Sequence, residues 1–342
     1  MIYDNVELHN VVATVAVPGK PGVRMQRVPD DVRQHLNELA NHIALSPTSC
    51  EVRFVTDALA PRVTLHSDTH HEFVHVAQGD FLQNEVMIEP GETKTIELQA
   101  SEDLRRMVQV DAGRTAFAPT VWRLRLSGTG RVHFVSVDAG GAAVRPPLAS
   151  EKPAVRWLAY GSSITQGFSA PRLANPYVIQ AARQMGVDVL NLGFGGSCHA
   201  ETELADHFAA RADWDVITCE LGINLVGHDM PVPEAARRFA YLARTLGAAH
   251  PRKAVVLITA FFSKNDLQPT DHPHSARSDA LRAAVREAHA GCGQPNVTLI
   301  EGTDLLPTAA GLTPDLVHPS DHGMSIIAGN LAGRLSPLIR GS

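Results

Sequence analysis

Apolar and polar residues alternate at every second position in several short segments of the first 145 residues. Turn signals such as Ala60-Pro61 and Pro90-Gly91 separate several of these segments. A period of two is that of a strand with one buried face, and many such strands close together are typical of a sandwich. The pattern therefore predicts an all-β, jelly-roll-like domain over residues 1–145. Its expected strands are 51–56, 62–66, 72–76, 85–88, 93–98, 122–126 and 131–137.

One helical stretch precedes these strands. Pro29-Asp30 is a typical helix start, and the residues that follow repeat apolar side chains at helical spacing. We predict a single helix near residues 30–43. Its apolar face consists of Val32, Leu36, Leu39 and Ile43.

The pattern changes after a Pro- and Ala-containing linker, placed at 146–153. From residue 154 to 342, short continuous apolar runs alternate with stretches of helical period. Such runs are typical of strands buried on both faces, and the repeated βα order predicts a parallel sheet covered by helices. The expected strands are 156–160, 187–192, 215–221, 254–260 and 297–301, and the expected helices are 176–185, 200–212, 232–248, 278–289 and 323–338.

Composition narrows the partners of this two-domain chain. The net charge of −6 over 342 residues argues against a nucleic-acid partner, which calls for a basic face. Residues 1–10 lack the features of a secretory signal, and no apolar run approaches the ~18 residues of a membrane helix. The four cysteines form no C-x-x-C pair, so we expect a reduced, cytoplasmic protein without a metal cluster.

Polar residues that carry chemistry follow the predicted strands of the second domain. Ser163 follows the first strand, Gly196 the second and Asn224 the third, while Asp315 and His318 follow the fifth. Sites in open parallel sheets form at the carboxyl ends of the strands, so these residues are expected on one rim.

Together these residue types fit nucleophilic acyl transfer. A serine nucleophile needs an imidazole to take its proton, and the imidazole needs a carboxylate to orient it. Ser163 is the candidate nucleophile, His318 the candidate base and Asp315 the candidate orienting acid. The tetrahedral intermediate needs donors for its oxyanion. The N–H groups of Ser163 and Gly196 and the side-chain amide of Asn224 are the expected donors.

Four stretches that contain these residues, in this order, resemble the sequence blocks of the SGNH hydrolases, also called GDSL esterases. They are residues 161–165, 191–196, 222–224 and 315–318. The resemblance covers 154–342, and residues 160–166 are similar to a subgroup with an added N-terminal β domain. It implies a flavodoxin-like α/β/α domain with strand order 2-1-3-4-5 and the same roles for Ser163, Gly196, Asn224, Asp315 and His318. Where the family usually has an aspartate before the serine, this chain has Ser162, which leaves Ser162 as an alternative nucleophile.

Other patterns in the sequence compete as candidate sites. Gly193-Phe194-Gly195 lacks the third glycine of a dinucleotide fingerprint, so no nucleotide cofactor is expected. His70, His71 and His75, like His272 and His274, lack the spacing that completes a zinc site and are interpreted as surface histidines. Cys198 is interpreted as a packed residue. Asp321 and His322 are interpreted as residues of a helix start, and the polar loop 261–275 as a border of the site.

The sequence predicts a serine esterase without a cofactor, acting on a small or carbohydrate-linked ester. The same residues also serve an acyltransferase that moves an acyl group from a thioester to a sugar or natural-product hydroxyl. A third interpretation is a carbohydrate-binding protein on a catalytically retired scaffold. A homo-oligomer is expected from the general frequency of symmetric dimers.

Overall fold

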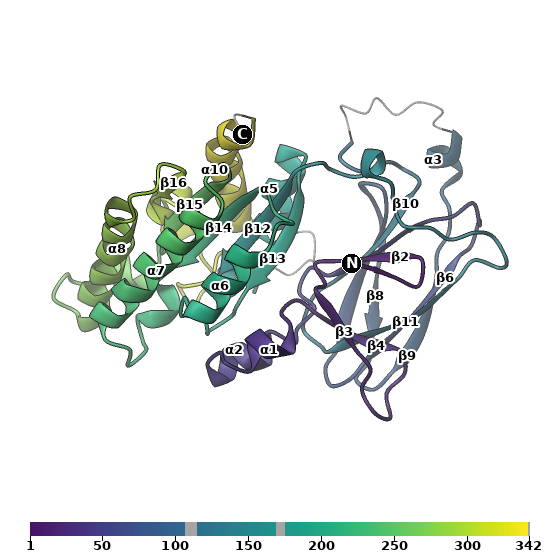
Figure 1. Cartoon of the computed structure of the whole chain (residues 1–342), viewed down its shortest axis with the longest axis horizontal. Coiled ribbons are helices and arrows are strands. Elements are labelled where there is room, and N and C mark those ends of the chain that lie inside the picture. Colours follow the sequence, from purple (N-terminus) through teal and green to yellow (C-terminus); the bar gives the residue numbers. More distant parts are fainter. Residues whose placement is uncertain (107–114, 169–174, 341–342) are drawn as a thin grey trace. The chain divides into compact units, whose positions relative to one another are not determined.

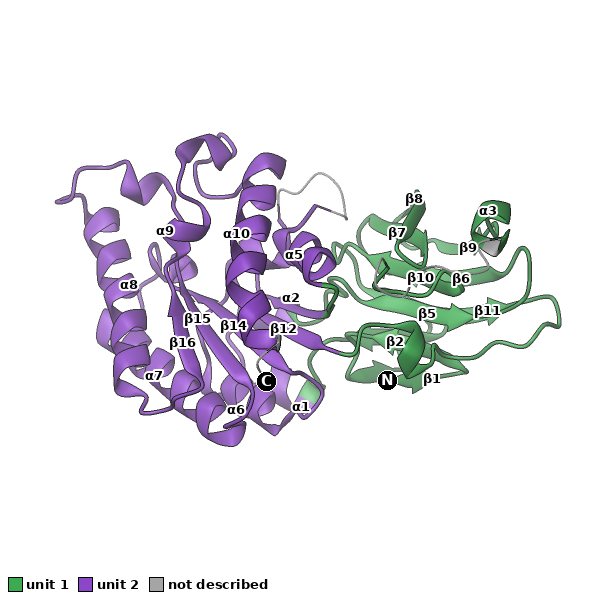
Figure 2. Cartoon of the chain, turned by 90° about the horizontal axis from the view of Figure 1, so that it is seen from above, with its two compact units in different colours: residues 1–30, 44–154, 186–188 green, residues 31–43, 155–185, 189–342 purple. Residues whose placement is uncertain are grey.

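The computed structural model describes residues 1–106, 115–168 and 175–340. The chain divides into two compact units (Figure 2). Unit 1 consists of Met1–Asp30, Ala44–Ala154 and Gly186–Asp188, and unit 2 of Asp31–Ile43, Val155–Met185 and Val189–Ser342. Neither unit is continuous in sequence, so residues 31–43, far from the second half of the chain, still group with it.

Unit 1 contains two antiparallel sheets, which confirms the predicted all-β sandwich. The first sheet has the order β1 (Ile2–Tyr3), β2 (Val6–His9), β5 (Glu51–Val55), β10 (Val121–Leu126), β7 (Glu72–Gln78), β8 (Phe81–Ile88). The second has the order β3 (Ala13–Val15), β4 (Val23–Gln26), β11 (Val132–Asp138), β6 (Arg62–Ser67), β9 (Thr93–Glu97). A short helix, α3 (Glu102–Arg106), follows β9.

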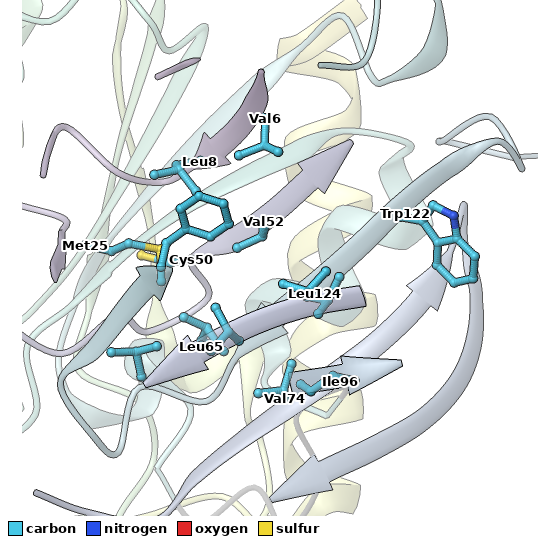
Figure 3. Close-up of a cluster of buried hydrophobic side chains, with 14 of the residues drawn as sticks. Val6, Leu8, Met25, Cys50, Val52, Leu65, Val74, Ile96, Trp122 and Leu124 are labelled. Atoms are coloured by element: carbon cyan, nitrogen blue, oxygen red, sulfur yellow. The ribbon is translucent and has the colours of Figure 1, made fainter. Parts of the chain in front are cut away.

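Alternate side chains of both sheets form the core of unit 1 (Figure 3). Val52, Val74 and Leu124 come from the first sheet, while Leu65 and Ile96 come from the second, and all are buried. Strands of both sheets thus contribute apolar positions to one shared interior, as the period of two predicted.

A cluster of buried charges accompanies this core. The Glu51 carboxylate accepts hydrogen bonds from Arg53, Arg123 and Arg125. Arg53 also forms a two-pronged pair with Asp188, at 2.6 and 2.8 Å. Burial alone raises the pKa of Asp188, but the charges of Arg53 and His9 outweigh it and lower this pKa to about 2. The pair explains why residues 186–188 belong to unit 1.

The single helix expected near residues 30–43 is instead two short helices. They are α1 (Asp30–Arg33) and α2 (Glu38–Ile43). The Asn37 side chain accepts a hydrogen bond from the Ala40 N–H at 2.9 Å, so Asn37 caps α2 and begins a new helix there. Leu39, expected on the apolar face, is 46% exposed.

Unit 2 contains a five-stranded sheet with the order β13 (Asp188–Gly193), β12 (Arg156–Gly161), β14 (Val216–Leu221), β15 (Ala254–Thr259), β16 (Val297–Ile300). This is the 2-1-3-4-5 order implied by the resemblance, and the pairings of β12, β14, β15 and β16 are parallel. The strands are almost wholly buried, as their continuous apolar runs predicted.

Two groups of helices cover the faces of this sheet (Figure 1). One group contains α5 (Tyr177–Met185) and α10 (Asp321–Arg340), and the other α6 (Thr202–Ala210), α7 (Val232–Ala249) and α8 (Pro273–Gly291). Helix α8 begins five residues earlier than expected because Pro273 is suited to the first turn. The expected loop 261–275 therefore contains the 3-10 turn η3 (Lys264–Asp266) and the start of α8.

Short helical elements complete unit 2 at the ends of its strands. They are α4 (Ser163–Gln166), η2 (Ile223–Leu225), α9 (Gly302–Leu305) and η4 (Ala309–Gly311), and η1 (Ala149–Glu151) lies in unit 1. Within the described parts of the chain, none of the helices has the length and apolar character that crossing a membrane requires.

Candidate active site

Ser163 lies at the junction between β12 and the one-turn helix α4. Ser162 caps this helix, because its Oγ accepts a hydrogen bond from the Ile164 N–H at 3.2 Å. Gly161 has no space for a side chain: a Cβ there would lie 2.3 Å from Thr165 Oγ1. The tight turn from strand to helix thus places Ser163 at the carboxyl end of β12.

Ser163, His318 and Asp315 are joined by hydrogen bonds. Ser163 Oγ lies 2.8 Å from His318 Nε2. His318 Nδ1 lies 2.6 Å from Asp315 Oδ2. The imidazole ring is largely buried, at 18% exposure of its side chain, whereas the Asp315 side chain is 47% exposed. The arrangement allows His318 to take a proton from Ser163 while the carboxylate holds the other ring nitrogen.

Asp315 also organises the turn that carries His318. Its Oδ1 accepts hydrogen bonds from the N–H groups of Val317 and His318, at 2.8 and 2.9 Å, and from the Thr313 hydroxyl. Burial raises the pKa of Asp315, but the hydrogen bonds from His318, Val317 and Thr313 outweigh burial and hold this pKa well below its usual range. The Asp315 carboxyl group is therefore ionised near neutral pH and places a negative charge beside the imidazole.

The expected oxyanion donors follow the ends of neighbouring strands. A Cβ at Gly195 would lie 3.4 Å from the Ser163 Cβ, so the glycine-rich loop runs beside the serine. Gly196 has φ +69°, a backbone conformation that favours glycine. Asn224, in η2, accepts a hydrogen bond from the Cys198 N–H through Oδ1 at 3.1 Å, which leaves its Nδ2 as the donor. Ser163 begins a helix, so its N–H has no acceptor within that helix.

Residues 31–43 contribute to this region of unit 2, which the sequence did not indicate. The Asn37 Nδ2 donates hydrogen bonds to the Ser197 carbonyl, at 3.2 Å, and to the Glu201 carboxyl group. Leu39 Cδ2 would lie 3.2 Å from a Cβ at Gly196. Leu39 was predicted on the apolar face of a helix, and its exposed place beside Gly196 has no signal in the sequence pattern.

Two further contacts surround the serine and the histidine. The Phe168 ring, 61% exposed, lies with its centroid 4.8 Å from that of His318. The buried carboxyl of Glu220, a residue not singled out in the sequence, accepts a hydrogen bond from the Ser162 N–H at 2.7 Å.

The competing residues fall outside this arrangement. Ser162 is 1% exposed and occupied in capping α4. Cys198 is buried, and burial raises the pKa of its thiol well above the usual range, which disfavours a thiolate nucleophile. Asp321 begins α10. Of the histidines interpreted as surface residues, His75 in β7 is in fact buried, at 1% exposure, on the strand face opposite the core residue Val74.

Within the described ranges, no group of three or more His, Cys, Asp or Glu residues could hold a metal ion.

Comparison with known proteins supports the resemblance seen in the sequence. Residues 159–326 match the GDSL-like lipase/acylhydrolase family. The chain has no match among curated proteins.

Several solved structures have a similar fold. The salicylyl-acyltransferase SsfX3 from a tetracycline biosynthetic pathway has a TM-score of 0.80 at 18% identity, covering 98% of this chain and 95% of that one. A family two carbohydrate esterase from Clostridium thermocellum, in complex with cellohexaose, has a TM-score of 0.61 at 16% identity, covering 85% and 92%. An acetyl xylan esterase, Est2A, from the rumen bacterium Butyrivibrio proteoclasticus has a TM-score of 0.60 at 11% identity, covering 98% and 96%. At these identities the likeness shows the fold.

The parallel sheet, its strand order and the matched residues lead to one conclusion: residues 159–326 form a domain of the GDSL-like lipase/acylhydrolase type, a family whose members are esterases or acyltransferases.

Proposed function

We propose that this protein is a serine-dependent acyl ester hydrolase that works through a covalent acyl-enzyme on Ser163. The observation that carries the proposal is the continuous pair of hydrogen bonds from Ser163 Oγ to His318 and from His318 to Asp315. In this proposal Ser163 is the nucleophile, His318 the general base and Asp315 the acid that orients the ring. The same unbroken connection does not support the interpretation as a retired binding scaffold.

The reaction proceeds in two halves. Ser163 Oγ attacks the acyl carbonyl carbon while its proton moves to His318 Nε2, and Asp315 stabilises the imidazolium that forms. His318 then gives this proton to the leaving oxygen or sulfur, which departs and leaves an ester on Ser163. In the second half His318 takes a proton from the attacking water or alcohol as its oxygen adds to the acyl carbon. His318 then gives this proton to Ser163 Oγ as the ester bond to the serine breaks.

The developing oxyanion is stabilised by the N–H groups of Ser163 and Gly196 and by Asn224 Nδ2. Each donor of this kind contributes about 3–4 kcal/mol in comparable sites. The hydrogen bond from the Cys198 N–H supports the role of Asn224, because it fixes which end of the amide is free to donate.

Acyl transfer to an alcohol is the second candidate. It is favoured by the similarity to the salicylyl-acyltransferase, which extends over 98% of this chain. Hydrolysis of carbohydrate-linked esters is in turn favoured by the similarity to a carbohydrate esterase and an acetyl xylan esterase. The catalytic groups are the same in both reactions, which differ in whether water or a bound hydroxyl reaches the acyl-enzyme.

The test compares the wild-type protein with Ser163→Ala on p-nitrophenyl acetate and longer esters, with and without a sugar acceptor. We expect the variant to lose at least about a thousandfold in kcat, as triad serines do. Mass spectrometry of the intact wild-type protein should show the acyl adduct, and peptide mapping should place it at residue 163. Partition between free acid and acylated sugar then separates the two candidates. Equal turnover by both proteins, or an adduct at Ser162, would contradict the assignment.

A further inference from the structure

Glu220 lies directly beneath the turn that carries Ser163. It is the fifth residue of β14 and is 1% exposed. In the register between β12 and β14, Tyr160 pairs with Cys219, so the next residues along, Gly161 and Glu220, lie side by side. A Cβ at Gly161 would lie 2.8 Å from Glu220 Oε2, and only a glycine allows this close approach.

The Glu220 carboxyl group connects three elements. Its Oε2 accepts hydrogen bonds from the Ser162 N–H at 2.7 Å and from the Thr165 hydroxyl at 3.2 Å. Thr165 Oγ1 in turn lies 2.8 Å from the hydroxyl of Tyr177 in α5. Glu220 of β14 thus binds the nucleophile turn directly, and Thr165 extends the connection to α5.

A buried carboxyl group is costly unless its contacts compensate for lost hydration. Burial raises the pKa of Glu220, although the hydrogen bonds from Ser162 and Thr165 and the charge of His318 act in the opposite direction. An apolar side chain would avoid that cost, but it would leave the Ser162 N–H without its acceptor in a buried place.

We propose that Glu220 is a positioning residue for the nucleophile, which acts by holding the Ser162 N–H and thereby the peptide that precedes Ser163. The proposal rests on the proposed function of Ser163. The Ser162–Ser163 peptide carries the Ser163 N–H, an expected oxyanion donor, and sets the direction from which Oγ meets the substrate. A displacement of about 1 Å in such a group costs on the order of a hundredfold in rate.

Three substitutions separate positioning from acid chemistry. Glu220→Gln keeps the length of the side chain and an oxygen acceptor but removes the acid. Glu220→Asp keeps the acid but withdraws it from the Ser162 N–H by one methylene, and Glu220→Ala removes the acceptor. We expect kcat on p-nitrophenyl acetate to fall about a hundredfold for Asp and Ala and no more than about fivefold for Gln, with KM within about twofold throughout.

Thr218→Val is the matched control. Thr218 lies two residues earlier in β14, is equally buried and accepts a hydrogen bond from Trp157 of β12 at 2.9 Å. This substitution breaks a polar contact between the same two strands, away from the nucleophile turn. It should lower the melting temperature while leaving kcat within about twofold of wild type.

Labelling of Ser163 by a fluorophosphonate distinguishes failure of this proposal from failure of the proposed function. If the wild-type protein neither turns over ester nor reacts at Ser163, the proposed function fails. If it does both, but Glu220→Ala has the kcat and labelling rate of Thr218→Val, the positioning role alone is overturned. The positioning role is likewise overturned if Glu220→Asp retains more activity than Glu220→Gln.

Discussion

The carboxylate of Asp315 holds both the ring of His318 and the turn that carries it in the proposed triad. Asp315 binds the His318 ring with one oxygen and the backbone N–H groups of Val317 and His318 with the other. Leu316 between them has φ +57°, a conformation that costs roughly 1–2 kcal/mol outside glycine. The contacts of Asp315 offset this strain, and the pair is fixed within four residues of sequence.

Asp315→Asn removes the charge of this residue but keeps the hydrogen bonds that hold the turn, so it tests the charge alone. The amide oxygen still accepts the backbone N–H groups, so the melting temperature should stay within a few degrees of wild type. The ring loses the negative partner that holds its tautomer, and kcat should fall by about 10³–10⁴, with little change in KM. A kcat within tenfold of wild type would show that Asp315 is not the orienting acid.

His199 makes the free energy of unfolding depend on pH. Burial, together with the charges of His228 and Arg238, lowers the pKa of His199 to about 4 from a usual value of 6.5. The unfolded chain therefore binds more protons between these two values, so the free energy of unfolding falls as pH drops from 6.5 to 4, by on the order of 3 kcal/mol.

Thermal denaturation across this interval measures the effect of His199. His199→Gln should show a flatter dependence of melting temperature on pH than wild type, while His274→Gln, at an exposed position in α8, should follow wild type. Parallel curves for all three proteins would rule out His199 as a source of the dependence.

At the scale of elements, periodicity predicted long strands and failed on short ones. The alternating segments from 51 to 137 are strands β5 to β11, within a few residues of the expected bounds. Strands β1 to β4, of two to four residues, are too short to show a period. The strand order of the parallel sheet came from the resemblance, because local hydrophobic patterns do not determine which strands are neighbours in a sheet.

The site was predictable where chemistry follows a strand. Ser163, Asn224 and the Asp315/His318 pair follow the first, third and fifth strands of the parallel sheet, whose carboxyl ends share an edge. Glu220 and Asn37 were not found, because Glu220 lies inside an apolar run and Asn37 inside a predicted helix. Their importance depends on which segments meet in three dimensions.

Asn37→Ala tests the contribution of α2. It removes the cap of this helix and the hydrogen bond to the Ser197 carbonyl, which together should lower the free energy of unfolding by about 1–2 kcal/mol. Because residue 197 follows Gly196, we also expect a reduced kcat. Asn41→Ala, in the same helix, loses only an acceptor for Arg33 and should affect stability alone. Identical kcat values for the two variants would show that the contacts of Asn37 have no effect on the oxyanion region.

At the scale of the whole molecule, the two units are interleaved along the chain. Unit 1 takes Gly186–Asp188 from the second half, where Asp188 meets Arg53, and unit 2 takes Asp31–Ile43 from the first half. A division of the sequence into 1–145 and 154–342 remains the simplest expectation for two domains, but it leaves each unit without one of these segments.

Truncation makes this arrangement measurable. A fragment of residues 154–342 lacks Asn37 and Leu39, so it should melt below the full chain and lose at least about tenfold in kcat/KM, as misplaced site groups do. The control is the full chain cut at a protease site inserted within 146–153, which keeps every residue and should keep its activity. A fragment as stable and active as the cut full chain would show that residues 31–43 are dispensable.

The interleaving also limits how a gene for such a protein can be reshuffled. The chain passes between the units at residues 30/31, 43/44, 154/155, 185/186 and 188/189. A single recombination crossover at 154/155 would join a new β-sandwich to an old catalytic sheet, but it would also replace residues 31–43 and keep the old Asp188. Exchange between relatives should therefore succeed mainly where the incoming half supplies a compatible partner for Gly196 and a basic residue for Asp188, so the two halves are expected to be inherited together.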